Sequence, residues 1–267
     1  MKNLDHFLIT RFNLKKEDWR KDKNSEEVLN EKWLTNRIEL FKNFCLPSVL
    51  GQTTKKFTWL IFFEENSGSE IQRLTEEIKS YPFIEPLRVN GYTEFQIRLS
   101  GLIEERVSKD SKFVLTTRLD NDDALNKDFM FELQKSVNIP IHNKVLHFPR
   151  GLFLDLRNNN RLASSYYPLN QFVSLLENRE KELKTVFCTE HDKWDSEFMI
   201  YPVDLKDAWL QVTHSKNMAN RFKGDLVFSS RLKSVPVKKL SFGIEYNLNV
   251  LYYRLKKQIL KNYRKAV

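Results

Sequence analysis

The chain has 267 residues, of which 41% are hydrophobic and 13% aromatic, which is enough to bury a full core and excludes a disordered protein. No apolar run is long enough to span a bilayer and no secretory leader is visible, so we expect a cytoplasmic protein. The net charge of +9 comes entirely from residues 231–267, which hold ten Lys or Arg and one acid. Because residues 1–230 are balanced, we expect no nucleic-acid partner.

Apolar patterning predicts alternating strands and helices in the first half of the chain. The expected strands cover 6–12, 57–63, 84–89 and 113–117, and the expected helices cover 33–50, 69–79 and 93–107. Strands that alternate with helices favour a parallel sheet with helices packed on its faces. The predicted fold class is therefore α/β, with a Rossmann-type, mostly parallel sheet.

The second half of the sequence is less regular. Strands are expected at 144–148 and 151–156, and a turn at 158–160 predicts that 161–167 returns as a hairpin partner. This pattern indicates a mixed or antiparallel C-terminal half added to the parallel sheet.

A basic amphipathic helix is predicted for the C-terminal segment, residues 244–267. Five apolar residues recur there at spacings of three and four: Ile244, Leu248, Leu251, Leu255 and Ile259. Two interpretations stay open. The helix packs its apolar stripe on the body, or it lies on an anionic membrane surface.

The fourth predicted strand runs directly into the acidic sequence Asp120-Asn121-Asp122-Asp123. Ligands of open α/β sheets gather at the carboxyl ends of strands, and neither glycine-rich phosphate motif occurs in the chain. Three adjacent carboxylates repel one another unless a cation neutralises them, and hard oxygen ligands favour Mn²⁺ or Mg²⁺. The alternative is an acidic cap for a helix that begins near Asn126.

The sequence Leu119–Leu125 resembles the Asp-x-Asp signature of nucleotide-sugar-dependent glycosyltransferases with the GT-A fold. Residues 1–220 more closely resemble the bacterial rhamnosyltransferase-like family, through the segments 7–12, 46–48, 57–60, 117–123 and 209–214. The segment 63–69 departs from that fold's Asp-Asp-Gly-Ser turn, because Glu64 stands where an Asp is expected.

The resemblance implies a GT-A-like glycosyltransferase domain over 1–230, followed by the basic segment 231–267. Its nucleotide-binding half would cover about 1–125 and its acceptor half about 126–230. By the same resemblance, Asp122 binds the metal ion, Asp120 binds the metal or the ribose, and His214 completes the metal shell. Asp123 would support its neighbours.

Further roles follow from the resemblance and from residue chemistry. Residues expected to contact the nucleotide-sugar are Thr10, Arg11, Glu64, Arg98, Arg118, Asp120 and Lys216. An inverting transfer needs a carboxylate base, for which Glu190 and Asp192 are equal candidates. Trp194, close by in the sequence, is the candidate for stacking on the acceptor sugar.

The function implied is a metal-dependent, inverting glycosyltransferase of bacterial surface polysaccharide synthesis. It would move a sugar, rhamnose by the family resemblance, from a nucleoside-diphosphate donor to a hydroxyl of a glycan or lipid-linked acceptor. Two alternatives compete with it: a metal-dependent phosphatase or nuclease built on the Asp cluster, and a non-catalytic protein that binds carbohydrate or membrane. Attachment to the inner face of the membrane through residues 244–267 would make the protein peripheral.

Overall fold

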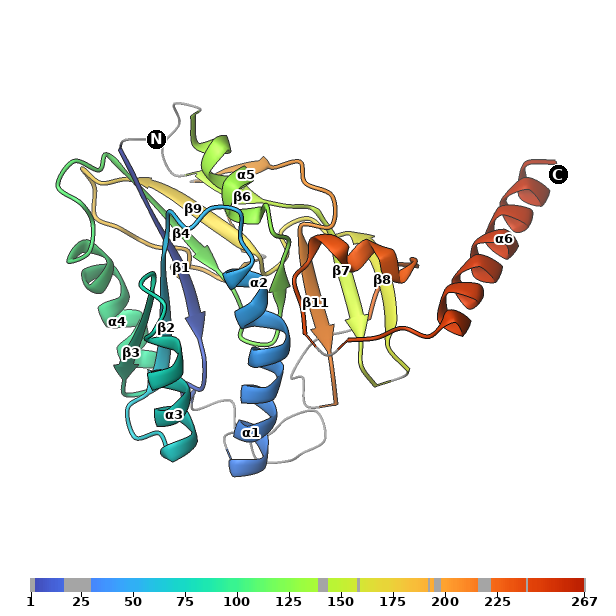
Figure 1. The fold of residues 1–267 in the computed structure, drawn as a ribbon. Coiled ribbons are helices and arrows are strands. Elements are labelled where there is room, and N and C mark those ends of the chain that lie inside the picture. Colours follow the sequence, from blue (N-terminus) through green and yellow to red (C-terminus); the bar gives the residue numbers. More distant parts are fainter. Residues whose placement is uncertain are drawn as a thin grey trace.

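Two sheets, packed beside each other, form the body of the protein (Figure 1). The computed structural model describes residues 3–16, 30–138, 144–157, 159–191, 193–194, 198–215, 222–238 and 240–266. The first sheet contains, in spatial order, β10 (Met199–Pro202), β6 (Lys144–His147), β9 (Val173–Asn178), β4 (Phe113–Arg118), β1 (Leu4–Arg11), β2 (Thr58–Glu64) and β3 (Ile84–Val89). The second contains β12 (Asp225–Leu226), β8 (Arg161–Tyr166), β7 (Arg150–Asp155), β11 (Trp209–Thr213) and β5 (Ala124–Leu125).

The predicted fold class is confirmed, because β3, β2, β1 and β4 are mutually parallel neighbours. The sequence patterns did not predict β9, which pairs antiparallel with both β4 and β6. In the register of the sheet, Ile9 of β1 lies opposite Leu60 of β2 and Arg118 of β4. The carboxyl ends of β1 and β4 therefore meet at one edge.

Helices cover both faces of the first sheet. They are α1 (Glu31–Leu40), α2 (Leu46–Leu50), α3 (Ser69–Ile78), α4 (Gly91–Glu104) and α5 (Phe129–Lys135). Alternate residues of a strand face opposite sides. In β2, Trp59 and Ile61 join the core that holds α3 and α5, whereas Leu60 and Phe62 join the core that holds α4.

The helix predicted over 33–50 is interrupted. Between α1 and α2 lies a π-helix, Phe41–Cys45, in which the backbone hydrogen bonds skip one more residue than in an α-helix. Its side chains Phe41, Phe44 and Cys45 are buried, so both flanking helices stay packed on the sheet.

The hairpin predicted around 158–160 is present in the second sheet, where β7 and β8 pair antiparallel. Asn159 and Asn160, in the connection between the two strands, both adopt the left-handed backbone conformation, with φ of 47° and 50°, which Asn tolerates better than most residues. On β7, Gly151 lies under the indole of Trp209 of β11, so closely that a side chain would collide with the ring.

The last helix, α6 (Ile244–Ala266), projects from the side of the second sheet (Figure 1). Its first turns are attached to the body by Tyr246, whose Oη lies 2.8 Å from Val227 O and 2.9 Å from Leu162 O. Further along the helix, Tyr253 Oη donates a hydrogen bond to Asp225 Oδ1 at 3.0 Å, and Lys257 pairs with the same carboxylate. Within the described ranges, no helix has the length and apolarity needed to cross a bilayer.

Candidate active site

Two guanidinium groups and one carboxylate converge where β1 and β4 end. Arg118 Nη2 lies 3.3 Å from Asp120 Oδ2, and Arg11 Nη2 lies 3.8 Å from Asp120 Oδ1. Both arginine side chains are largely buried, and neither Nε has a hydrogen-bond partner among the residues that the structure describes. Two cations that share one anion leave one positive charge in excess, which suits an anionic ligand.

Aromatic rings enclose this pair of arginines. The Phe187 ring lies 5.0 Å from the Arg11 guanidinium carbon and 5.6 Å from that of Arg118, and Tyr92 lies 5.2 Å from Arg11 on another side. Burial, together with the charge of Arg118, lowers the pKa of Arg11 to about 10. Burial alone would raise the pKa of Asp120, but the charges of Arg118 and Arg11 lower it below its ordinary value.

Asp122 is buried between an arginine and a histidine. Arg37 Nη1 lies 2.6 Å from Asp122 Oδ2, and His214 Nε2 lies 3.0 Å from the same oxygen. Burial by itself would raise the pKa of Asp122, but the charge of Arg37 and the His214 hydrogen bond lower it well below its usual range. Asp122 is therefore a carboxylate held by groups from α1 and from the end of β11.

The remaining members of the acidic cluster have structural partners. Asp123 accepts hydrogen bonds from Val212 N at 2.9 Å and Gln171 Nε2 at 3.1 Å, which ties the end of β4 to β11 and to the segment before β9. Burial and the neighbouring charges of Asp122 and Asp120 raise its pKa. Asn121 donates to Phe12 O at 2.5 Å and accepts from Arg37 Nη1 at 3.1 Å.

The second sheet places a further charged group at the edge that carries His214. Asp155, at the end of β7, lies in register with Thr213 of β11. Its buried carboxylate accepts hydrogen bonds from Arg157 Nε at 2.8 Å and from Arg161 Nη2 at 2.7 Å. Burial alone would raise the pKa of Asp155, but these hydrogen bonds lower it well below its usual range.

Asp122 and His214 offer two donors that suit a divalent cation. Their ligating atoms lie 3.0 Å apart, so both would reach one ion that replaced the hydrogen bond between them. Across the described parts of the chain, no group of three or more Asp, Glu, His and Cys is arranged to hold a metal. Such a pair fits an ion like Mg²⁺, which keeps several waters and takes further ligands from substrate phosphates.

Two of the residues expected to contact the nucleotide-sugar are buried beside the cluster. The Thr10 hydroxyl accepts a hydrogen bond from Trp59 Nε1 at 3.0 Å, so Thr10 faces the core. Glu64 Oε2 accepts from Lys15 N at 2.9 Å, and the Glu64 backbone N donates to Asn13 Oδ1 at 3.0 Å. Glu64 thus fixes the loop that follows β1.

Three other predicted residues have partners outside the acidic cluster. Arg98 is half exposed on α4 and pairs with Glu94 at 2.7 Å. Glu190 is exposed and pairs with Lys193 at 2.9 Å. Trp194 is buried against Phe198, with ring centroids 4.9 Å apart. Asp192 and Lys216 lie outside the described residues.

Sequence reasoning missed Arg37, which makes the shortest contact to Asp122. A signal for it existed, because Arg37 lies four residues after Trp33 and four before Phe41, both buried. A single basic residue at the centre of an apolar helix face needs a buried partner. Tyr92 and Phe187 carried no comparable signal, since aromatic residues are common in cores.

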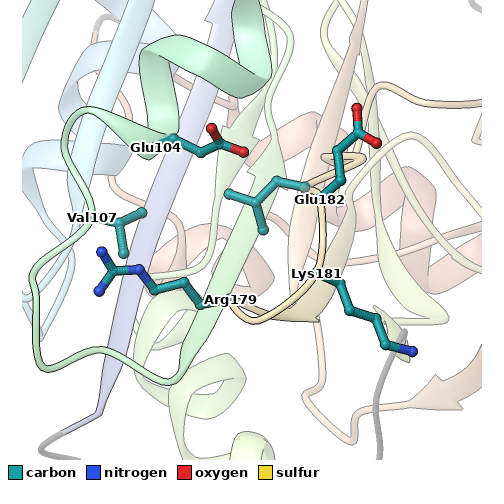
Figure 2. A pocket seen from close by; sticks show the side chains of 6 residues that line it. Glu104, Val107, Arg179, Lys181 and Glu182 are labelled. Carbon is teal, nitrogen blue, oxygen red and sulfur yellow. The ribbon is translucent and has the colours of Figure 1, made fainter.

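A pocket of about 360 Å³ lies elsewhere, at the opposite edge of the first sheet (Figure 2). Glu104 and Val107 line it from the end of α4, and Arg179, Lys181 and Glu182 line it from the segment after β9 (Figure 2). That segment adjoins the start of β4, whereas the acidic cluster follows its end, so this pocket is not part of the candidate site.

A family model described as "Putative rhamnosyl transferase" matches residues 5–226. The chain belongs to this family. The match includes both sheets and the acidic cluster, and it ends before α6. No curated protein matches the chain.

Solved structures give weaker likenesses. The chain is similar to S. aureus TarS 1–349 in complex with UDP, with 12% identity, 58% of this chain and 37% of that chain covered, and a TM-score of 0.36. For S. aureus TarS 1–349 alone the identity is 11%, the coverages are 78% and 60%, and the TM-score is 0.42. The inositol-1-phosphate CTP transferase from T. maritima is 11% identical, with coverages of 80% and 92% and a TM-score of 0.34. The chain thus spans less than two thirds of either TarS structure.

Proposed function

We propose that this chain is a glycosyltransferase that moves a sugar, rhamnose by its family, from a nucleoside-diphosphate donor to a hydroxyl of a glycan or lipid-linked acceptor. The observation that carries the proposal is the convergence of Arg11 and Arg118 on Asp120 at the carboxyl edge of the parallel sheet. Family membership supports the reaction class, and the excess positive charge supports a diphosphate as the group bound there.

In this proposal the arginines do the electrostatic work of the transfer. Arg11 and Arg118 donate hydrogen bonds to the diphosphate, whose negative charge grows as the bond to the sugar breaks. Because their side chains are already fixed by Asp120, Phe187 and Tyr92, little reorganisation is needed when the donor binds.

A divalent cation, Mn²⁺ or Mg²⁺, is part of the proposal. Asp122 and His214 would hold it, with Asp120 close by, and it would screen the charge of the leaving diphosphate. Arg37 keeps the Asp122 carboxylate ionised and in place.

Calorimetry with uridine, guanosine and thymidine diphosphates tests the proposal. We expect at least one of the three nucleotides to bind. Arg11→Gln or Arg118→Gln should weaken that binding about tenfold or more, because a charged hydrogen bond to phosphate contributes about 1.5–3 kcal/mol. Arg73→Gln on the exposed face of α3 removes the same charge elsewhere and should leave binding unchanged. Failure of all three nucleotides to bind would contradict the proposal. Binding that is equal with Mn²⁺ and with a chelator would remove the cation from it.

The base of an inverting transfer gives a second test. We expect either Glu190→Gln or Asp192→Asn to lower turnover by about 10²-fold or more, the scale of lost general-base catalysis, while donor binding is retained. Glu182→Gln, at an exposed position on the opposite edge of the sheet, is the matched control. Normal turnover in both variants would mean that another group is the base or that the transfer retains configuration.

A further inference from the structure

The apolar stripe of α6 is exposed to solvent. Its members Ile244, Leu248, Leu251, Leu255 and Ile259 are between 46% and 81% exposed, and Tyr252 beside them is exposed as well. Large apolar side chains that follow one helix face in this way are a typical interaction surface.

The body of the protein contacts a different face of the same helix. At about 100° per residue, Tyr246, Val250 and Tyr253 fall on the side opposite Leu251 and Leu255. Tyr246 and Tyr253 bond the second sheet, and Val250 is buried. The body therefore holds α6 with the stripe turned outward, and it could not cover the stripe without releasing these contacts.

Positive charge borders the stripe. Residues 244–266 contain six basic residues and one acid, Glu245. Lys256 lies at one margin of the stripe and Arg254 at the other, so each can extend past the apolar side chains toward a charged surface. A second copy of the same helix would bring like charges together, whereas an anionic surface complements them.

We infer that α6 is a membrane-docking helix that lies on an anionic bilayer, with its stripe in the apolar layer and its basic residues on the lipid headgroups. The attachment is reversible and sensitive to salt, because headgroup attraction is screened over the Debye length.

The segment just before α6 is held near the end of the second sheet that carries the candidate active site. Asn160, in the turn between β7 and β8, donates to Ser241 O at 3.3 Å, just before the helix begins. The same hairpin carries Asp155, which lies in register with Thr213, the last residue of β11 and the one before His214. In Figure 1 the arrows of β1, β7 and β11 point to the edge at which α6 starts. Docking through α6 therefore holds the second sheet, to which Tyr246 and Tyr253 bind, beside the bilayer.

Co-sedimentation of the full chain with vesicles tests the inference without any nucleotide. We expect binding to vesicles of equal parts phosphatidylglycerol and phosphatidylcholine at low salt, weak binding to pure phosphatidylcholine, and release at high salt. Leu251→Ser with Leu255→Ser removes apolar surface at two exposed positions without changing charge, and it should weaken binding about tenfold or more.

The contribution of the basic residues is tested with matched variants in the same vesicle assay. Lys256→Gln with Lys261→Gln should weaken binding by about fivefold per residue, whereas Lys79→Gln with Lys109→Gln, at exposed sites on the body, should not. Full-length protein that stays in the supernatant with anionic vesicles at low salt would overturn the inference. So would light scattering that shows a dimer abolished by the two serine substitutions. Nucleotide binding by these variants is measured separately, so failure of the docking inference leaves the proposed function standing.

Discussion

Asp122→Asn is expected to reduce sugar transfer by at least about 10²-fold, the scale of losing one electrostatic contact in an active site. The substitution keeps the shape of the side chain but removes the charge that faces Arg37 and His214. Breaking a buried ion pair on one side also destabilises a fold by about 3–5 kcal/mol, because the other charge is left uncompensated. We therefore expect a lower Tm as well, measured by circular dichroism beside the transfer rate.

Two further variants separate the loss of activity from the loss of stability. Arg37→Met combined with Asp122→Asn removes both charges, and it should recover Tm while transfer stays low. Asp123→Asn makes the same change one residue away. The side-chain oxygen of the new asparagine can still accept the hydrogen bond from Val212 N. Its NH₂ group can donate to the Gln171 oxygen once the Gln171 side-chain amide flips, so the transfer rate should be close to normal. Unimpaired turnover of Asp122→Asn in saturating Mn²⁺ or Mg²⁺ would exclude Asp122 as a metal ligand.

Gly151→Ala is expected to lower the free energy of unfolding by about 3 kcal/mol, measured by denaturant unfolding. An added Cβ would lie 2.1 Å from Trp209 Cδ2. The indole cannot move aside, because it stacks on Phe172 at 5.0 Å and donates from Nε1 to Phe148 O at 2.8 Å.

Gly101→Ala is the matched control for this prediction. Gly101 lies inside α4, and nothing lies within 4 Å of the position its Cβ would take. Alanine is favoured over glycine within a helix, so stability should rise by about 0.5–1 kcal/mol. A Gly151→Ala variant as stable as the unmodified chain would show that the Trp209 ring is not fixed over β7.

The parallel half of the fold was predictable because each of its strands is an apolar run that alternates with an amphipathic helix. The segment 84–89, for example, was predicted with the bounds that β3 has. By contrast, β9 is a six-residue segment whose hydrogen bonds go to β4 and β6, far away in the sequence. Its pattern does not distinguish a short strand from other buried segments.

The candidate site was predictable where it follows a strand. Asp120 and Asp122 could be placed at a sheet edge because they come directly after β4. Arg37 reaches the same point through the packing of α1, and Phe187 through a segment that returns along β4, where Val186 N bonds Thr116 Oγ1 at 2.8 Å. Such contacts depend on tertiary packing and leave little trace in local sequence.

The π-helix at Phe41–Cys45 has a consequence for insertions and deletions in this family. It accommodates one residue more than an α-helical turn would, so the extra residue is absorbed locally and α1 and α2 keep the faces that they present to the sheet. The same residue inserted in regular α-helical geometry would turn α1 by about 100° relative to α2 and carry Arg37 away from Asp122. A deletion confined to the π-turn restores regular α-helix and leaves Arg37 on the same face, whereas a deletion elsewhere between Arg37 and α2 would rotate it away.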